Sequence, residues 1–367
     1  MKIAVFLPNW VGDACMATPA LRALRQRYRE DAEILLIGRR APIEILQGNP
    51  FVDRCIEYRP RGRPKQMGRR DVAWALRREG VDVALLLTNS LSTAMMAYLG
   101  GVNRRIGYAK DGRSWFLTDR FHLPKQAGKK IPIPAIDAYL RLVEILGCDI
   151  SDRHTELDVS DCERAAAKEV WEDFGWEETI PTVAINSSGA YGSSKVWPRD
   201  KVVSLARNLA ETGRYQVLLH CGPGERDEAN GTAQECGTPR VRSLGEGRAG
   251  VRQELPLGLS KAVLGKAGVV VTTDSGPRHI ALALNRPVIT LFGSTSPEWT
   301  RSYNVPEKEF YLGLACQPCY RRTCPLQHQA CMRDLSVPTI LKAIEERIGS
   351  ASEPFPSSGS PRLSDVA

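Results

Sequence analysis

The chain has 367 residues, of which 43% are hydrophobic and 25% charged, close to an ordinary globular protein. At roughly 100–200 residues per domain, this length predicts two or three domains with cores of their own. The composition excludes a collagen, a coiled coil and a mostly disordered chain, and no apolar run reaches the ~18 residues that cross a bilayer. The opening MKIAVFLPNW predicts a first strand that ends at Pro8, not a signal peptide, so we expect a cytoplasmic protein.

The net charge of +8 is distributed unevenly along the chain. Residues 1–160 carry 26 Lys and Arg against 18 Asp and Glu, whereas residues 161–367 carry 24 of each. The excess positive charge of residues 1–160 would attract a polyanion, an anionic lipid or a phosphorylated substrate, although a solvated basic face accounts for this charge equally well. No recognition motif for nucleic acid accompanies it, so nucleic acid is disfavoured as a partner. The basic residues concentrate in two clusters, one of Arg59, Arg61, Arg63, Lys65, Arg69 and Arg70, the other of Arg104, Arg105, Lys110 and Arg113.

Apolar runs alternate with helical patterns through the first half of the chain. We expect strands over residues 2–7, 32–38, 81–88 and 104–108, and helices over 17–28, 70–80, 90–100 and 134–147. Residues 110–134 are polar, basic and contain Pro, which predicts a long loop. Strands that alternate with helices indicate a parallel sheet covered by helices on both faces.

The alternation begins again in the second half. Helices are expected over 163–175, 199–213, 255–268 and 277–285, and strands over 182–188, 215–222, 269–275 and 288–294. Two α/β units in tandem predict a two-domain enzyme with a central cleft. We place an acceptor domain at 1–155, a donor domain at 160–348 and a disordered Ser/Pro-rich tail at 350–367.

In open α/β sheets, ligands bind at the carboxyl ends of the strands. The first strand is followed by Pro8-Asn9-Trp10-Val11-Gly12-Asp13, which is neither a dinucleotide fingerprint nor a P-loop and so disfavours a nicotinamide enzyme. Gly12 permits a tight approach of another group. Asp13 stands at a helix N-terminus, where a carboxylate can act as a general base or simply cap the helix.

Three strand ends in the second half suit a nucleoside diphosphate. At Thr273–Pro277 a helix begins after an apolar strand, and helix N-termini bind phosphate, although a capped helix with Pro at its first position is the alternative. Gly276 lets a diphosphate come close to the backbone, Asp274 can accept hydrogen bonds from sugar hydroxyls, and His279 lies in the first helical turn.

The other two strand ends are Ser187–Lys195 and Gly222–Glu225. The first segment has small, polar residues and ends in one cation, which suits either a loop that holds a diphosphate or a plain flexible loop. In the second segment, the Glu225 carboxylate could accept a hydrogen bond from a ribose hydroxyl. No D-x-D pair occurs in the chain, although enzymes that hold a sugar nucleotide through Mg²⁺ commonly need clustered carboxylates. We therefore expect Lys195 and the helix at Gly276 to neutralise the diphosphate without a metal.

Three segments, NWVGDACMATPALRALR, SSGAYGSSKVWP and TTDSGPRHIALALNRPVITLFGSTSP, carry a family resemblance. The sequence resembles the ADP-heptose:lipopolysaccharide heptosyltransferases of glycosyltransferase family 9 over about residues 1–345. The resemblance implies the GT-B fold, two Rossmann-like parallel-sheet domains that face a central cleft. The G-A-Y-G-x-x-K-x-W-P form is more similar to the second heptosyltransferases, which extend the first heptose, than to the first, which act on Kdo.

The resemblance also implies a reaction and roles for residues. Heptose passes from ADP-heptose to the heptose of the lipopolysaccharide inner core with inversion, with no cofactor required, and Asp13 is the general base. Two departures from the family pattern are Thr272-Thr273 and Arg278, the latter where an apolar residue is common. The implied donor-binding residues are Ser187, Ser188, Lys195, Glu225, Asp274, Ser275, Gly276 and His279. For the acceptor we expect Gly12, next to Asp13, and five arginines from the basic clusters of the first half: Arg59, Arg61, Arg63, Arg104 and Arg105.

The implied partners explain the uneven charge. The acceptor is an anionic glycolipid, so the basic first half would face it and an anionic membrane surface, which predicts peripheral association with the inner face of the inner membrane. Two other classes remain open, a non-catalytic nucleotide-sugar-binding protein on the same fold and a nucleic-acid binder. The transferase interpretation requires Asp13 to face the turn Asp274–Gly276 across a shared hollow.

Four of the ten Cys lie close together in the segment 316–331, with His328 among them. Short spacings of this kind are typical of structural metal sites, but only one C-x2-C pair is present. Three interpretations remain open: a bound structural Zn²⁺, a cluster of reduced thiols, and disulfides. The candidate ligands are Cys316, Cys319, Cys324 and Cys331.

Overall fold

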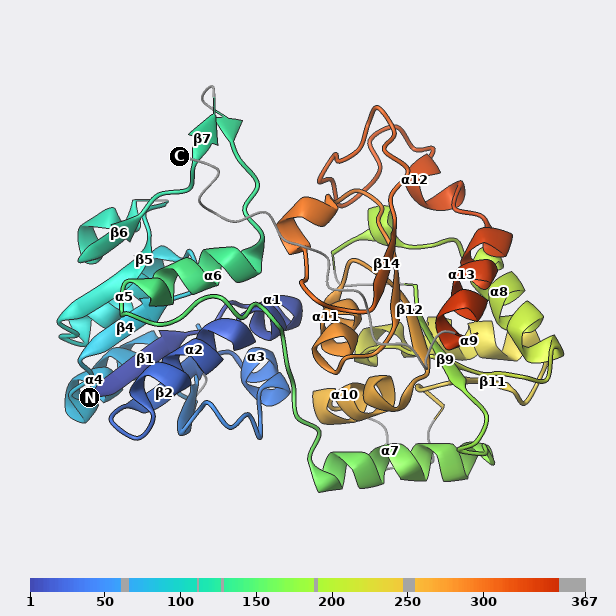
Figure 1. Ribbon diagram of the computed structural model, residues 1–367, viewed down its shortest axis with the longest axis horizontal. Helices are drawn as coiled ribbons and strands as arrows, with labels where there is room; N and C mark the ends of the chain where they lie inside the picture. The colour runs from blue at the N-terminus through green and yellow to red at the C-terminus, as the bar shows by residue number, and fades with distance from the viewer. Residues whose placement is uncertain (61–65, 111, 127–128, 188–190, 247–254, 350–367) are drawn as a thin grey trace.

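Two parallel sheets of six strands form the two halves of the molecule (Figure 1). The computed structural model describes residues 1–60, 66–110, 112–126, 129–187, 191–246 and 255–349. The strand orders are β3-β2-β1-β4-β5-β6 and β11-β10-β9-β12-β13-β14, so both sheets have the doubly wound arrangement with a reversal beside the first strand. The expected fold of two Rossmann-like parallel-sheet domains is confirmed.

The first sheet forms because its central strands are short, almost wholly apolar runs that helices cover on both sides. All five residues of β1 pair with β2, and β4 is buried throughout. The strands are β1 Lys2–Phe6, β2 Glu33–Gly38, β3 Arg54–Glu57, β4 Val83–Leu86, β5 Arg104–Tyr108 and β6 Asp119–Phe121, and the helices are α1 Val11–Met16, α2 Thr18–Tyr28, α3 Arg40–Ile45, α4 Arg69–Glu79, α5 Leu91–Leu99 and α6 Ala135–Glu144.

The second sheet repeats the pattern after the linker that follows α6. Its first helix, α7, starts at a capping box in which Ser160 and Glu163 satisfy each other's backbone N–H, and it ends at Gly175 in the left-handed region, φ 64°. The strands are β9 Thr182–Asn186, β10 Gln216–Leu219, β11 Val241–Ser243, β12 Val269–Thr273, β13 Val288–Leu291 and β14 Glu307–Phe310, and the helices are α7 Asp161–Phe174, α8 Arg199–Glu211, α9 Arg226–Cys236, α10 Leu257–Lys266, α11 Gly276–Ala283, α12 Ala330–Arg333 and α13 Val337–Gly349.

The edge strands and some short elements differ from the sequence expectations. The strands β3, with the sequence RCIE, and β14, with the sequence EKEF, were not expected. Both are partly exposed and contain charged residues, so neither has the apolar run that predicts a strand. The expected loop over 110–134 instead contains the 3₁₀ turn η1 Arg113–Phe116, the strand β6, and a small hairpin of β7 Lys125–Gln126 and β8 Lys129–Lys130. Hydrophobic periodicity detects an element only where one face is buried.

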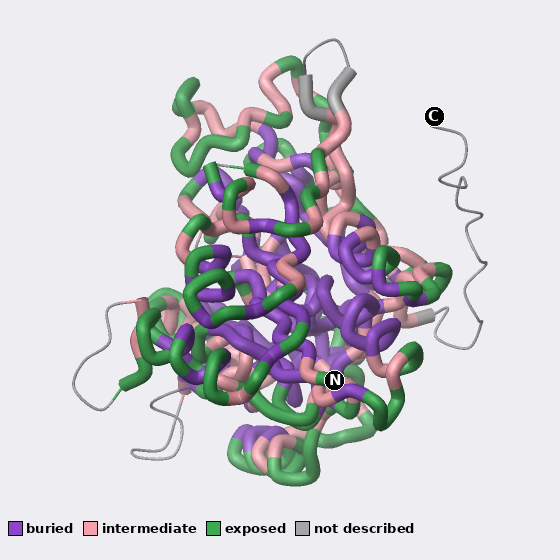
Figure 2. The backbone as a smooth tube through the Cα atoms, turned by 90° about the vertical axis from the view of Figure 1, so that its left-hand side faces the viewer, coloured by how far each residue is buried: buried purple, intermediate pink, exposed green. Residues whose placement is uncertain are grey.

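The apolar interior is continuous between the two domains. One cluster contains Ile3 and Leu36 of the first sheet together with Val270 and Ile280 of the second domain. Viewed from the side of the first domain, Figure 2 shows these buried segments at the centre beneath outer helices with exposed turns. The helices α4 and α5 cover the opposite face of the first sheet and contribute to a separate cluster. Among the described helices, none has both the length and the apolar character needed to span a membrane.

A fully buried cation joins the two domains beside the cleft. Lys261 of α10 places Nζ 3.1 Å from a carboxylate oxygen of Glu163 and 3.5 Å from the carbonyl oxygen of Gln47 in the first domain. A buried charge depends on such partners, because its removal from water costs several kcal/mol. Lys261 therefore ties α10 to α7 and to the first domain at once.

We expect Lys261→Met to lower the free energy of unfolding by about 2–4 kcal/mol, since it leaves the Glu163 carboxylate without its buried partner. The matched control is Lys266→Met on the same helix, whose ion-pair partner Glu178 is exposed, and it should change stability by less than about 1 kcal/mol. Urea denaturation followed by circular dichroism measures both. Equal effects of the two substitutions would contradict this role of Lys261.

Candidate active site

Two helix N-termini meet at the boundary between the domains. Helix α1 follows β1, helix α11 follows β12, and Figure 1 shows the two helices side by side at the centre of the molecule. A Cβ atom on Gly12 would lie 2.6 Å from Cδ2 of His279, and one on Gly276 would lie 3.8 Å from Cβ of Val11. A side chain at position 12 would therefore require the His279 ring or the two helices to shift.

Asp13 and Asp274 line the same pocket, which has a volume of about 220 Å³. Lys195, Ser275, Gly276 and His279 contribute to its wall. The two aspartates come from different domains, and each follows the carboxyl end of a central strand. This is the shared hollow that the transferase interpretation requires.

Asp13 is the third residue of α1 and does not cap that helix. The N-cap position belongs to Trp10, and the Asp13 carboxylate accepts a hydrogen bond of 3.3 Å from the hydroxyl of Tyr139 on α6. Burial raises the pKa of Asp13 to about 6, the Tyr139 hydrogen bond opposes this shift, and the negative charge of Asp274 adds to it. A carboxylate with this pKa is ionised at neutral pH yet still takes up a proton readily, as a general base must.

Asp274 has the opposite electrostatic environment, because four donors surround its carboxylate. Burial alone would raise its pKa, but Arg278 and Lys195 outweigh burial and hold the pKa well below its usual range. Oδ1 accepts from Arg278 and Thr300, both at 3.2 Å, and Oδ2 accepts from Lys195 at 2.9 Å and Thr295 at 2.7 Å. Asp274 is therefore a fixed negative charge in the pocket.

Arg278 orients Asp274 from behind. Its guanidinium is fully buried, donates to both carboxylate oxygens of Glu307 at 2.6 and 3.0 Å, and donates to Asp274 Oδ1. Sequence reasoning registered Arg278 only as a departure from the family pattern. The available signal was its place in the first turn of the helix that begins just after Asp274, from which a long cationic side chain can reach back to that carboxylate.

Lys195 and His279 complete the wall around Asp274. Lys195 lies in the 3₁₀ turn η2 Ser193–Lys195, and its Nζ donates to the Asp274 carbonyl oxygen at 2.7 Å and lies 4.6 Å from the ring centre of Tyr191. Burial, aided by the nearby Arg278 charge, lowers the pKa of His279 to about 3, so this imidazole is neutral at physiological pH. His279 therefore packs against Gly12 as an uncharged ring.

A larger pocket of about 550 Å³ adjoins the first and shares Trp10, Gly12, Ser275 and Gly276 with it. Apolar side chains of Leu257, Pro277 and Ile280 line this second pocket. The two volumes together make an elongated cleft with the carboxylates at one end and an apolar chamber at the other.

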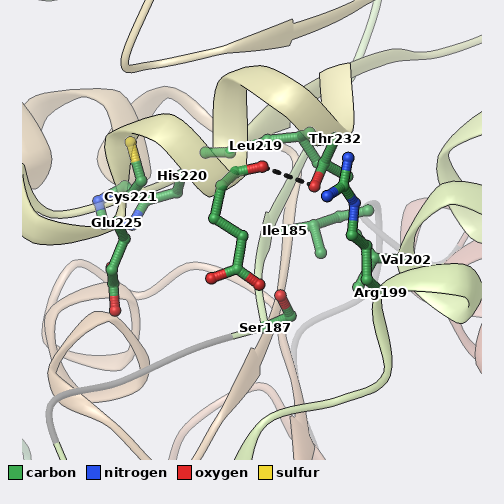
Figure 3. A pocket seen from close by; sticks show the side chains of 11 residues that line it. Ile185, Ser187, Arg199, Val202, Leu219, His220, Cys221, Glu225 and Thr232 are labelled. Carbon is green, nitrogen blue, oxygen red and sulfur yellow. Dashed lines mark hydrogen bonds between the residues drawn. The ribbon is translucent and has the colours of Figure 1, made fainter. Parts of the chain in front are cut away.

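Glu225 lies at the wall of the apolar chamber and also borders a third, smaller pocket (Figure 3). One of its carboxylate oxygens accepts from the Gly222 N–H at 2.9 Å, which fixes the turn after β10. Figure 3 shows Ser187 and Arg199 across the small pocket from this turn, and the Thr232 hydroxyl donating to the Glu228 carbonyl oxygen at 2.7 Å.

A neutral polar network behind the apolar chamber was not anticipated from the sequence. Burial lowers the pKa of His220 to about 4, and its ring contacts the Ser260 hydroxyl. The side chain of Asn186 donates to the His220 carbonyl oxygen at 3.1 Å and accepts from the Ser275 hydroxyl at 3.4 Å. This network fixes Ser275, which the two main pockets share.

The remaining site predictions are dispersed. Arg104 and Arg105 begin β5, at the edge of the sheet opposite Asp13, where Arg104 pairs with Asp119 at 3.0 Å and Arg105 donates to the Phe116 carbonyl at 2.6 Å. Arg59 is exposed beyond the carboxyl end of β3. Ser188, Arg61 and Arg63 lie outside the described residues. The acceptor-binding roles of these arginines stay predictions.

The four clustered cysteines all lie in the described part of the chain, and all ten cysteines are free thiols. The pKa of the Cys331 thiol is raised, first by burial and then by the nearby Cys319, Cys324 and Cys316. Even so, the described residues contain no group of three or more Cys, His, Asp or Glu arranged to hold a metal ion. The zinc interpretation of the four candidate ligands, one of the three left open by the sequence, stays a prediction.

Asp13→Asn should stabilise the fold by about 1–2 kcal/mol at pH 8, because the native state binds the Asp13 proton more tightly than the unfolded chain and ionisation above pH 6 therefore costs free energy. The gain should shrink as the pH falls from 6 towards 4, where the native carboxyl is already protonated. Urea denaturation at pH 5 and pH 8 measures it. The control Asp31→Asn alters an exposed carboxylate and should give no such pH-dependent gain.

The chain is similar in sequence and in fold to known heptosyltransferases. The chain is 28% identical to the lipopolysaccharide heptosyltransferase 2 of Escherichia coli K12 over 314 residues, covering 82% of this chain and 85% of that protein. A family 9 glycosyltransferase structure from Veillonella parvula superposes with a TM-score of 0.79 at 20% identity, covering 95% of this chain and 97% of the other. The E. coli ADP-heptose heptosyltransferase II structure gives 0.75 at 24%, covering 96% and 100%.

The sequence model of one protein family matches residues 69–330, well over half of the chain. Its description is glycosyltransferase family 9, heptosyltransferase. The matched region runs from α4 of the first domain through Lys195, Asp274 and Arg278 to the start of α12. The chain therefore belongs to glycosyltransferase family 9 and is a heptosyltransferase.

Proposed function

We propose that this enzyme transfers L-glycero-D-manno-heptose from ADP-heptose to a heptose of the lipopolysaccharide inner core, with inversion at the anomeric carbon. The observation that carries the proposal is that Asp13 and Asp274 face one pocket with opposite protonation tendencies. The choice of substrates is supported by the similarity to the lipopolysaccharide heptosyltransferase 2 of E. coli and to the solved structure of the E. coli ADP-heptose heptosyltransferase II.

The donor fits the elongated cleft. The apolar chamber, lined by Leu257, Pro277 and Ile280, accepts the nucleoside, with Glu225 as the acceptor for a ribose hydroxyl. The diphosphate lies at the N-terminus of α11, where backbone N–H groups and the helix dipole favour negative charge. Lys195 adds a positive charge beside it, and the heptose reaches Asp274.

The reaction is a single displacement. The acceptor hydroxyl oxygen attacks the anomeric carbon of heptose from the side of Asp13, and the Asp13 carboxylate takes the hydroxyl proton. The bond from that carbon to the β-phosphate oxygen breaks, and ADP leaves with the electron pair. Lys195 and the N-terminus of α11 stabilise the charge that develops on the leaving phosphate. One displacement inverts the configuration.

The pH dependence of kcat/KM tests this mechanism, and a substitution of Tyr139, the hydrogen-bond partner of Asp13, should change it. The base works only when ionised, so kcat/KM should fall as the pH drops through about 6. Tyr139→Phe removes the hydrogen bond that lowers the Asp13 pKa, and the acid limb should move upward by about 0.5–1 pH unit. The rate of ADP release, measured from pH 5 to pH 9, gives the acid limb of the original enzyme and that of the variant.

Asp13→Asn supplies the complementary test of the base. We expect kcat to fall by about 10²–10⁴-fold while ADP-heptose binding, followed by calorimetry, stays within about threefold of the original enzyme. A variant that keeps full turnover would exclude Asp13 as the base. A protein that binds the donor but never releases ADP with any heptosylated acceptor would instead be a nucleotide-sugar-binding protein.

We also propose that transfer needs no divalent metal. The Asp274 carboxylate already accepts from four donors, and Lys195 with the N-terminus of α11 supplies the positive potential that a metal would otherwise provide. Excess EDTA should leave the rate of ADP release unchanged, and added Mg²⁺ should not raise it. A loss of activity in EDTA that Mg²⁺ restores would contradict the proposal.

The lipid-linked acceptor brings the enzyme to a membrane in this proposal. An inner core that bears phosphate and carboxylate groups is anionic, and the excess positive charge of the chain lies within residues 1–160. The acceptor domain is therefore the side that approaches the bilayer.

A further inference from the structure

Helix α5 presents an apolar face to solvent. Leu91, Met95, Tyr98 and Leu99 are all exposed, and their spacing places them on one stripe of the helix, whereas Thr93, Ala94, Met96 and Ala97 are buried on the other side. The nine residues of α5 contain no charged side chain. A surface helix ordinarily turns polar residues outward, so this stripe reverses the usual pattern.

Trp115 extends the stripe beyond the helix. It lies in η1, which packs against α5 through an edge-to-face contact between Phe116 and Tyr98, with ring centres 5.4 Å apart. Trp115 is 86% exposed, more than any other large hydrophobic side chain in the described residues. Of the thirteen exposed large hydrophobic residues in that part of the chain, five belong to this surface, named here the α5 face: Leu91, Met95, Tyr98, Leu99 and Trp115.

Arginines border the α5 face. The guanidinium of Arg105 lies 5.4 Å from the ring centre of Tyr98, and the guanidinium of Arg78 lies 5.0 Å from that of the exposed Trp74 on the adjoining helix α4. Arg69, Arg70 and Arg77 are further exposed cations of α4. Exposed Leu, Tyr and Trp beside Arg are the composition of segments that lie in the interface of an anionic bilayer.

The position of the α5 face also suits a lipid-linked acceptor. Figure 1 shows α4 and α5 on the outer side of the first domain, away from the second sheet. Helix α5 begins after the carboxyl end of β4, at the sheet edge from which α1 carries Asp13, and it ends toward the opposite edge, where Tyr98 lies against Arg105 at the start of β5. None of the five residues of the α5 face lines the cleft, so docking on this face does not occupy the substrate pockets.

We propose that the α5 face is the surface with which this enzyme docks onto an anionic lipid bilayer, with Leu99 and Trp115 entering the headgroup region and the neighbouring arginines pairing with lipid phosphates. This inference rests on the proposed lipid-linked acceptor, but it concerns a surface separate from the catalytic cleft. The cations account for salt-sensitive attraction, and the apolar side chains account for binding that persists in salt.

The test is sedimentation of the full chain with sucrose-loaded vesicles of phosphatidylethanolamine and phosphatidylglycerol in equal parts, at low and high salt. The double substitution Leu99→Ser with Trp115→Ser should lower the partition coefficient by about tenfold or more, with the larger relative loss at high salt. The matched control is Leu326→Ser, since Leu99 and Leu326 are both 59% exposed, and it should stay within about twofold of the original protein. Equal binding of all three proteins would overturn the proposal.

Two further measurements distinguish bilayer docking from a role in the cleft and from self-association of the chain. The rate of ADP release with a delipidated, water-soluble acceptor should be the same in the double variant and the original enzyme, because neither residue lines the cleft. Absence of that activity in the original enzyme would contradict the proposed function and leave the vesicle result standing. If the double variant bound vesicles normally but sedimented as a smaller oligomer, the α5 face would be a contact between copies of the chain, and the bilayer proposal would be wrong.

Discussion

The close approach of α1 to α11 at Gly12 is the constraint on which the active site depends. A side chain at position 12 would clash with the His279 ring, so that either this ring or the two helices would have to shift. Because α1 carries Asp13 and α11 begins just after Asp274, this single contact places two carboxylates from different domains in one pocket. The apolar core that runs between the domains and the buried Lys261 hold the helices at that distance.

Within that pocket, identical side chains acquire different chemistry from their neighbours. The pKa of Asp13 is raised by burial beside one hydroxyl donor, whereas Asp274 is flanked by two cations and two hydroxyls. The pair also interacts unfavourably, which helps to keep Asp13 receptive to a proton. One carboxylate that takes up a proton near neutral pH and one that stays ionised thus follow from the distribution of charge, and His279 in the same pocket stays neutral.

The sequence predicted the central strands, the doubly wound fold and the facing turns, because buried apolar runs and Gly-Pro helix starts leave local signals. It predicted that Asp13 and Asp274 would meet, but from resemblance and topology, since no local pattern fixes a contact between residues so far apart. It missed β14 and the Arg278–Glu307 pair, because an exposed strand that reads EKEF has no periodicity to detect. It also grouped Arg104 and Arg105 with the acceptor site on charge alone, whereas their place at the start of β5 sets them at the far edge of the sheet.

Glu307 lies on β14, the outermost strand of the second sheet, and through Arg278 it reaches Asp274 inside the cleft. The edge strand of the second sheet is thus connected to the Asp274 carboxylate through one guanidinium. The side chains of Glu307, Arg278 and Asp274 are at most 7% exposed, so this connection is shielded from solvent along its whole length. A substitution at Glu307 would therefore change the partners of Arg278, and through Arg278 the surroundings of Asp274, although Glu307 lines neither of the two main pockets.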